Sequence, residues 1–166
     1  YLQNQKTKPQ TVTPKTTGFA FTQQKDRVTL RLDGRKITEY LLDHPQLTRR
    51  AFINVHTHTG IQVTRNYPPM PNDGGDHPVM HPGIWMSFGH LDGQDYWRLK
   101  AKVLHNGFVD KPKAGKGRAS FAVRNRYLTS DGNSEICHEI NRIEFRRHEI
   151  GMLMLWDSTF QNDKRD

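Results

Sequence analysis

The sequence predicts an all-β fold, an antiparallel β-sandwich, on two observations. Apolar and polar side chains alternate with a period of two along several short stretches, which is the pattern of a strand with one buried face. In residues 27–32, for example, Val28, Leu30 and Leu32 fall on the same face. Glycine, proline, asparagine and aspartate separate these stretches at short intervals, and neither a βαβ pattern nor an internal repeat occurs.

The chain alternates between predicted strands and turns from residue 27 onward. The predicted strands are residues 27–32, 37–42, 51–58, 60–65, 83–89, 96–109, 120–128, 136–147 and 150–156. Asp33-Gly34 fits a type I′ hairpin turn, in which both central residues take positive φ. Residues 66–82 contain five prolines, which lack the hydrogen-bond donor a central strand needs, so we expect a long loop there.

Two of the predicted strands carry a further expectation. Residues 136–147 fit both helical spacing and a strand, and we predict a strand with a bulge near Asn141 because a β-rich region and an Asp-Gly turn precede it. Residues 150–156 are almost continuously apolar, which predicts a buried strand.

The domain organisation predicted for the 166 residues has three parts. Residues 1–25 form a disordered polar lead-in, residues 26–162 a β-sandwich domain that we expect to be incomplete at its C-terminal end, and residues 163–166 a charged tail. Because the chain begins with Tyr1 instead of methionine, we expect a removed signal peptide and export to the periplasm or the extracellular space. The longest apolar run, residues 150–156, is far shorter than the about 20 residues of a membrane-spanning helix.

The charge balance raises the question of an acidic partner. Lys and Arg total 25 against 17 Asp and Glu, which gives a formal net charge of +8 at pH 7. The sequence nevertheless argues against nucleic acid, because no basic helix, zinc finger or RNA-binding aromatic signature is found. The densest basic run, residues 111–118, contains Pro112 and two glycines and predicts a loop or hairpin. A single cysteine, Cys137, excludes an internal disulfide, and we expect an inert, partly buried thiol.

Histidines are concentrated in the middle of the chain. Five of the nine lie between positions 56 and 90: His56, His58, His77, His81 and His90. Since side chains alternate along a strand, His56 and His58 share one face and are candidate ligands for one divalent metal ion. His77 and His81 lie in the proline-rich loop, and the loop can fold so that both imidazoles point toward one place. The alternative for His56 and His58 is a pair of polar residues on a solvated face, and for His77 and His81 it is hydrogen bonding within the loop or exposure.

Aromatic and acidic residues accompany these histidines. Trp85, Tyr96 and Trp97 are either core residues or flat apolar walls of a ligand pocket, and ligand pockets usually combine such walls with a few polar groups. Asp92 follows His90 at a predicted turn, and turn geometry alone could also explain it. Asp157 ends the last predicted strand, either as a strand-end cap or as a ligand-binding group.

Several segments together resemble the PmoA-like family, labelled "methane oxygenase PmoA" and otherwise a domain of unknown function. The resemblance covers about residues 26–162 and lies in residues 60–66 (GIQVTRN), 76–77 (DH), 81–85 (HPGIW), 89–97 (GHLDGQDYW), 123–127 (VRNRY) and 155–160 (LWDSTF). The resemblance implies a β-rich domain similar to the larger supersandwiches of galactose mutarotase type, which handle sugars. It also implies that this chain corresponds to the N-terminal part of such a domain. We treat methane oxidation as a name, because a membrane oxygenase needs apolar spans that this sequence lacks.

These observations lead to three functional hypotheses. The first is a carbohydrate-handling β-sandwich whose ligand is a sugar or another small polar molecule. The protein would either bind this ligand without changing it or transform it by acid–base chemistry. Its catalytic candidates are His77, His81 and Asp92, and its substrate-binding candidates are Trp85, His90, Trp97, Arg98 and Asp157. The second is a metal-dependent oxygenase or hydrolase that uses the histidine cluster. The third is a non-enzymatic polyanion-binding module driven by the net charge.

Overall fold

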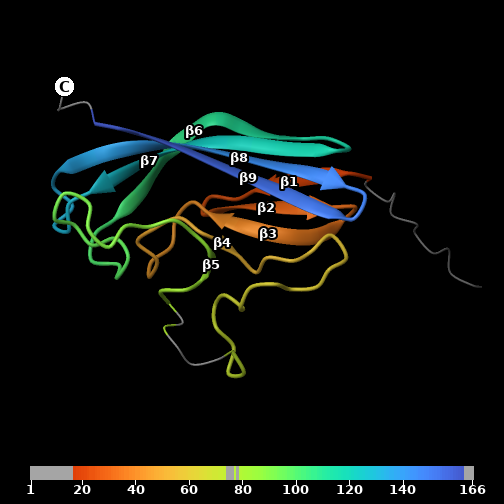
Figure 1. The fold of residues 1–166 in the computed structure, drawn as a ribbon, viewed down its shortest axis with the longest axis horizontal. Coiled ribbons are helices and arrows are strands. Elements are labelled where there is room, and N and C mark those ends of the chain that lie inside the picture. Colours follow the sequence, from red (N-terminus) through yellow and green to blue (C-terminus); the bar gives the residue numbers. More distant parts are fainter. Residues whose placement is uncertain (1–16, 74–76, 78, 163–166) are drawn as a thin grey trace, which may run out of the picture.

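Two antiparallel sheets make up the structure, a computed structural model that describes residues 17–73, 77 and 79–162 (Figure 1). All regular secondary structure in these residues is β, which confirms the predicted all-β class and is consistent with a β-sandwich. The first sheet has the order β1 (Phe19–Gln23), β2 (Arg27–Leu32), β3 (Arg35–Leu41), β4 (Phe52–Ile53), β5 (Gly83–Ile84), and the second has the order β6 (Val103–Ala114), β7 (Arg118–Leu128), β8 (Glu135–His148), β9 (Gly151–Gln161).

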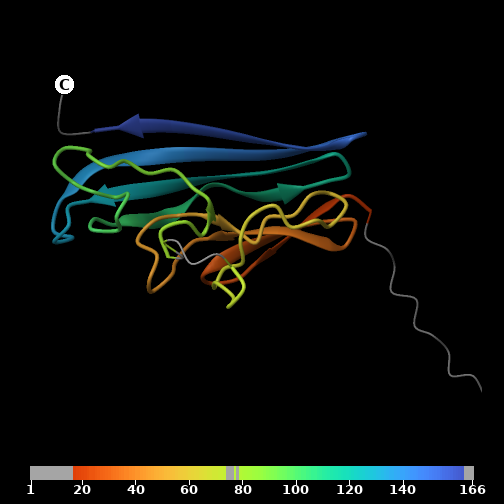
Figure 2. The same cartoon turned by 60° about the horizontal axis from the view of Figure 1, so that its bottom comes forward.

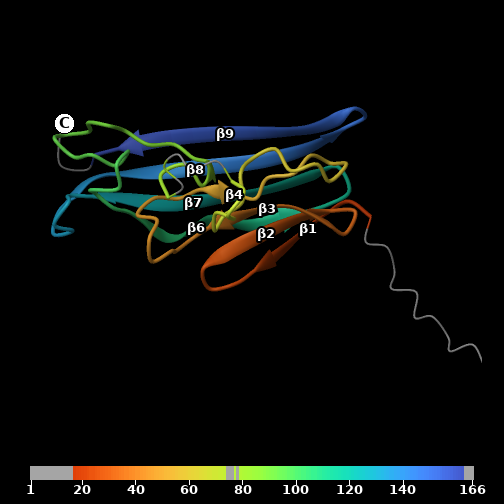
Figure 3. The ribbon, with the colours of Figure 1, turned by 90° about the horizontal axis from the view of Figure 1, so that it is seen from below.

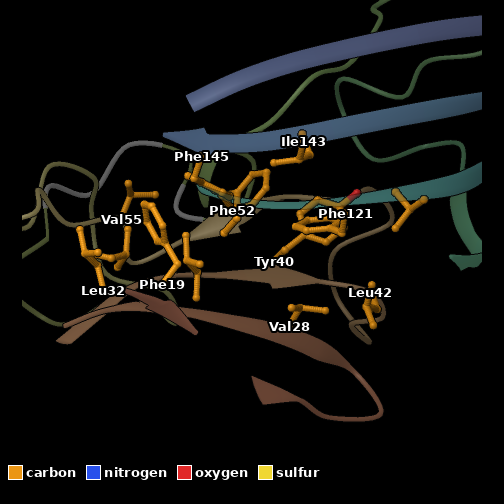
Figure 4. Close-up of a cluster of buried hydrophobic side chains, with 14 residues drawn as sticks. Phe19, Val28, Leu32, Tyr40, Leu42, Phe52, Val55, Phe121, Ile143 and Phe145 are labelled. Carbon is orange, nitrogen blue, oxygen red and sulfur yellow. The ribbon is translucent and has the colours of Figure 1, made fainter. Parts of the chain in front are cut away.

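The main core lies between the two sheets, which form separate layers when the molecule is turned (Figures 2 and 3). Alternate residues of β2 face it, since Val28, Leu30 and Leu32 are all buried. From the second sheet, Phe121 enters between the rings of the first, with ring centroids 5.2 Å from Tyr40 and 6.3 Å from Phe52 (Figure 4). Burying such large rings is the main source of stabilisation between the layers.

The first strands follow the predicted alternation. β2 has the predicted bounds, and Asp33 and Gly34 take φ values of 51° and 80°, as the type I′ turn requires. The range 1–25 is not wholly a lead-in, however, because Phe19–Gln23 form β1 and pair with β2. Phe19 and Phe21, two residues apart, lie on one face and pack against the core, a short signal within a polar stretch. Residues 1–16 lie outside the described residues.

The strands predicted between residues 51 and 89 are much shorter in the structure. β4 stops at Ile53 because Asn54 takes a left-handed φ of 50° and its side-chain amide bonds both the backbone nitrogen and the carbonyl of Tyr67. Beyond it, the predicted strands 51–58 and 60–65 do not form a regular ladder: one isolated bridge pairs His56 with Gln62, and the backbone nitrogen of Val63 donates to the carbonyl oxygen of Val55. The predicted strand 83–89 is reduced to β5, so the long segment between β4 and β6 is mostly loop (Figure 1).

The second sheet contains the longest strands, and three expectations need correction there, one each for β6, β8 and β9. β6 begins at Val103 instead of residue 96, since residues 96–101 belong to the preceding loop. β8 keeps a regular register through Asn141, which pairs with Val123 and Ser158, so the bulge expected at Asn141 is absent and the irregularity lies between Tyr127 and Leu128.

The last strand, β9, lies at the edge of the second sheet (Figure 3). It is not the buried strand that residues 150–156 predict, because Ile150 is 86% exposed and Leu153 50% exposed. Its apolar run is continuous because one face packs partly on the core, through Met152, Met154 and Trp156, while the other face meets solvent. The predicted tail, residues 163–166, lies outside the described residues.

A helix of the length and hydrophobicity required to cross a bilayer is not found in the described part of the chain.

Candidate functional site

Four aromatic side chains of the loop between β4 and β6 contact one another in series. The His77 and His81 rings lie 6.1 Å apart between centroids, and His81 lies 5.7 Å from Trp85 and 6.2 Å from Trp97. The two indoles meet edge to face at 4.7 Å. We call these four residues the ring cluster. Trp97 is 41% exposed, so part of its ring is open to a ligand.

A buried arginine, Arg49, lies under the ring cluster and connects three points of the loop. Its guanidinium carbon sits 3.6 Å from the centroid of the Trp85 ring, a cation–π contact. One terminal nitrogen donates to the carbonyl oxygens of Tyr96 and Trp97, and the other donates to that of Met80. Burial lowers the pKa of Arg49 to about 10, so the guanidinium remains charged at neutral pH.

Gly83 fixes the position at which the loop returns to the first sheet. Its φ of 154° is in the region that favours glycine, and a Cβ at this position would overlap the carbonyl oxygen of Phe52. This close approach allows β5 to pair with β4, with Gly83 opposite Ile53 and Ile84 opposite Phe52. Trp85 follows immediately, and the pairing therefore places its indole beside Arg49.

Tyr96 anchors the other end of the loop to the second sheet. The side chain is fully buried, and its hydroxyl donates to the carbonyl oxygen of Leu128 over 2.9 Å. Burial raises the pKa of Tyr96 to about 12, so the hydroxyl stays protonated and keeps donating. Tyr96 is thus a core residue, which decides between the two interpretations of this aromatic, whereas its neighbour Trp97 is partly exposed and packs against Trp85 and His81.

The other predicted binding and catalytic residues have different surroundings. Asp92 has a left-handed φ of 49° and lines a pocket of about 340 Å³ with Phe88, Leu91 and Cys137, among other residues outside the ring cluster. His90 is exposed beside the same turn. The guanidinium of Arg98 pairs with Asp95 within the loop, at 3.1 Å.

Asp157 lies on β9 and lines a different hollow, on the second sheet. Of the eight predicted catalytic and binding residues, the structure therefore brings His77, His81, Trp85 and Trp97 into ring contact, and it places Asp92 and Asp157 at two other pockets.

The candidate metal ligands His56 and His58 line a third pocket, of about 390 Å³, whose walls are mainly apolar. The Nδ1 atom of His56 lies 2.6 Å from the carbonyl oxygen of Asn54. Within residues 17–73, 77 and 79–162, no group of three or more His, Cys, Asp or Glu side chains has the geometry to hold a metal ion. Asp76, next to His77, lies outside the described residues.

Sequence reasoning missed the two adjacent arginines that precede β4. Arg49 and Arg50 are 1% and 6% exposed, although arginine is rarely buried. A signal is present in the sequence, because the pair directly precedes the apolar residues Ala51, Phe52 and Ile53. The position of the two arginines beside an apolar strand thus indicated that their side chains are buried. It could not indicate to which carbonyl groups the Arg49 guanidinium donates hydrogen bonds.

The buried Glu139 was missed as well, and it links residues 123–127 of β7 with residues 155–160 of β9. Its carboxylate accepts a hydrogen bond from Asn125, in residues 123–127, at 2.9 Å and another from Ser158, in residues 155–160, at 2.5 Å. Trp156 donates through its indole N–H to the Ser158 hydroxyl. Glu139 is only 2% exposed, so this network joins β7, β8 and β9 from within.

The fold and the ring cluster define the chain as a β-sandwich protein with an aromatic and histidine-rich loop fixed by a buried arginine. The chain belongs to a family described as "Family of unknown function (DUF6807)", which matches residues 27–166. This description names neither PmoA nor an activity. The comparisons with curated proteins and with solved structures gave no match.

Proposed function

We propose that the protein binds carbohydrate at the ring cluster and that the two indoles are the platform for the sugar. The observation that carries this proposal is the contact of the Trp85 and Trp97 rings with each other and with His81. A sugar ring has apolar C–H faces and polar edges, so it suits an aromatic surface bordered by groups that form hydrogen bonds. The sugar-handling fold implied by the PmoA-like resemblance agrees with this choice of ligand class.

The support from Arg49 makes the platform suitable for binding. Trp85 rests on a guanidinium whose donors are held by carbonyl oxygens on both sides of the loop, at Met80 and at Tyr96. A surface ordered before the ligand arrives loses less conformational entropy on binding. Arg49 thus positions the indoles and does not need to touch the sugar.

In an acid–base reaction on the bound sugar, His81 is the group in the best position. Its ring contacts both indoles and the ring of His77, and an imidazole can both accept and donate a proton. Asp92 has no part in this step, because it lines another pocket. Export remains a prediction, which fractionation of cells that produce the protein would check.

Tryptophan fluorescence can test the proposal because two of the three tryptophans belong to the ring cluster. In a Trp156→Phe background, titration with neutral mono- and disaccharides should change the emission, and Trp97→Ala should weaken binding by roughly tenfold or more while the protein stays folded by circular dichroism. Ile150→Ala, at an exposed position away from the ring cluster, is the matched control and should bind like its parent. Equal affinity with and without the Trp97 indole would rule out the platform.

A further inference from the structure

The second sheet carries a hollow of about 640 Å³ on the face opposite the core. Side chains alternate along each strand, and Phe121 and Ile143 point into the core, so their neighbours Ala122 and Arg142 point outward. The strands lie side by side in the order β6, β7, β8, β9 (Figure 3), and the hollow takes lining residues from all four.

The strand register arranges these lining residues in two neighbouring rows. Each row crosses the whole sheet through Cα partners: Asp110, Ala122, Arg142 and Asp157 form the first, and Lys113, Ser120, Glu144 and Leu155 the second. Because sheet pairing sets the spacing within each row, the polar groups stand on a rigid support. Sites built on strands hold their geometry better than sites built on loops.

Irregular pairing of β6 explains why this face is hollow. The register between β6 and β7 shifts three times, between His105 and Phe108, between Phe108 and Asp110, and between Asp110 and Lys113. Bulges of this kind bend a strand and increase its twist. Ala122 is only 2% exposed although it points outward, and its Cα partners Asp110 and Arg142 carry longer side chains.

The charged groups in the hollow are balanced in sign and available to a ligand. Within the described residues, the side chains of Asp110, Lys113, Arg142 and Asp157 make neither an ion pair nor a hydrogen bond. The remaining two, Glu144 and Arg118, pair with each other, and Arg146, which does not line the hollow, also pairs with Glu144. Three acids and three bases thus line one hollow of a protein whose net charge is +8.

We propose that this hollow is a second binding site, for a neutral, polyhydroxylated ligand of disaccharide size. Carboxylates accept hydrogen bonds from hydroxyl groups while guanidinium and ammonium groups donate to them, so the hollow offers both functions to a polyol. The balance of charge disfavours a ligand with net charge of either sign, and Ala122 and Leu155 offer apolar contact to C–H groups. The volume lies within the range of small-molecule sites. The site is independent of the ring cluster.

NMR of the isotope-labelled protein tests this inference, with maltose, cellobiose, lactose and xylobiose as probes. At least one disaccharide should shift the backbone amide signals of Ala122, Arg142 and Asp157 in a saturable way. Asp157→Asn, which removes charge at unchanged shape, and Arg142→Gln, which removes the guanidinium and shortens the side chain, should each weaken binding roughly tenfold. Thr159→Ala, on the same face of β9 but outside the hollow, is the matched control and should leave the affinity unchanged.

Trp97→Ala separates this site from the ring cluster, because it should leave the shifts in the hollow intact. Shifts confined to the ring cluster, or affinities that survive both charge-removing substitutions, would overturn the second site and leave the proposed function standing. Saturable binding of citrate, phosphate or a basic peptide in place of the disaccharides would overturn the assignment to a neutral polyol.

Discussion

Replacing Arg49 by methionine retains an apolar stem but removes the donors to three carbonyl oxygens of the loop. A buried polar group without a partner costs about 1–3 kcal/mol, so Arg49→Met should lower the free energy of unfolding by at least about 2 kcal/mol. Urea denaturation followed by far-ultraviolet circular dichroism measures this change.

The matched control for Arg49 is Arg98→Met in the same loop. The Arg98 side chain is 62% exposed and pairs with Asp95 at the surface, where ion pairs contribute about 0–1 kcal/mol. A loss for Arg49→Met no larger than that for Arg98→Met would contradict the anchoring role of Arg49.

Cys137 gives a pH-dependent prediction at the same scale. Burial raises the pKa of this thiol from 9.0 to about 11, with Glu135 and Glu139 acting in the same direction. Only the thiolate reacts, so labelling by 5,5′-dithiobis(2-nitrobenzoate) at pH 8 should be much slower in the folded protein than in urea. The folded rate should rise with pH toward 11. Equal rates at pH 8 in buffer and in urea would show that the thiol is not protected.

The same shift has a definite sign for stability. The folded state holds the Cys137 proton more tightly than the unfolded state, so its contribution to stability is fully present below pH 9 and is lost as the pH rises from 9 toward 11.

At the scale of single elements, the two-residue strand β5 depends on one glycine. Gly83→Ala should strain the backbone and push β5 away from Phe52, lowering the unfolding free energy by about 1–3 kcal/mol or more and weakening sugar binding at Trp85. Gly89→Ala is the natural comparison, since a Cβ there meets no atom within 4 Å. Thermal unfolding and fluorescence titration of the two variants should therefore differ, and identical behaviour would argue against the role of Gly83.

Elements differed in how well the sequence predicted them, for a physical reason. β2 and β7 alternate apolar and polar residues along their length, because one face packs on the core and the other is more polar, and this pattern is local. β5 contains only Gly83 and Ile84, and its existence depends on a close approach to a strand about thirty residues earlier. The end of β4 likewise depends on hydrogen bonds between Asn54 and the distant Tyr67.

For the whole molecule, Phe121 is the side chain that best tests the contact between the sheets. Its ring meets Phe21 and Tyr40 of the first sheet at 5.8 and 5.2 Å. Truncating a buried phenylalanine costs about 3–5 kcal/mol, so Phe121→Ala should destabilise the protein by that amount in urea denaturation. Ile150→Ala, at an 86% exposed position, should change stability by less than about 0.5 kcal/mol. A small loss for Phe121→Ala would show that the layers do not depend on this contact.

The candidate site was only partly predictable because its members meet through folding in three dimensions. His77, His81, Trp85 and Trp97 lie within 21 positions of one another, and the proline-rich loop already suggested that they could converge. Asp92 and Arg98 lie within the same stretch but face elsewhere, since a left-handed turn at Asp92 and the pairing with Asp95 redirect them. Spacing alone does not distinguish these two outcomes.

The sequence by itself determined the class of fold, because strand periodicity and turn residues express local preferences of the backbone. It also determined that this chain has too few cysteines for an internal disulfide. Only the tertiary structure decided that Arg49 is buried against Trp85. It also decided that Asp157 lines a hollow on the face of the second sheet that points away from the core. Both depend on contacts between residues far apart in the chain, which arise only when two sheets and a long loop pack together.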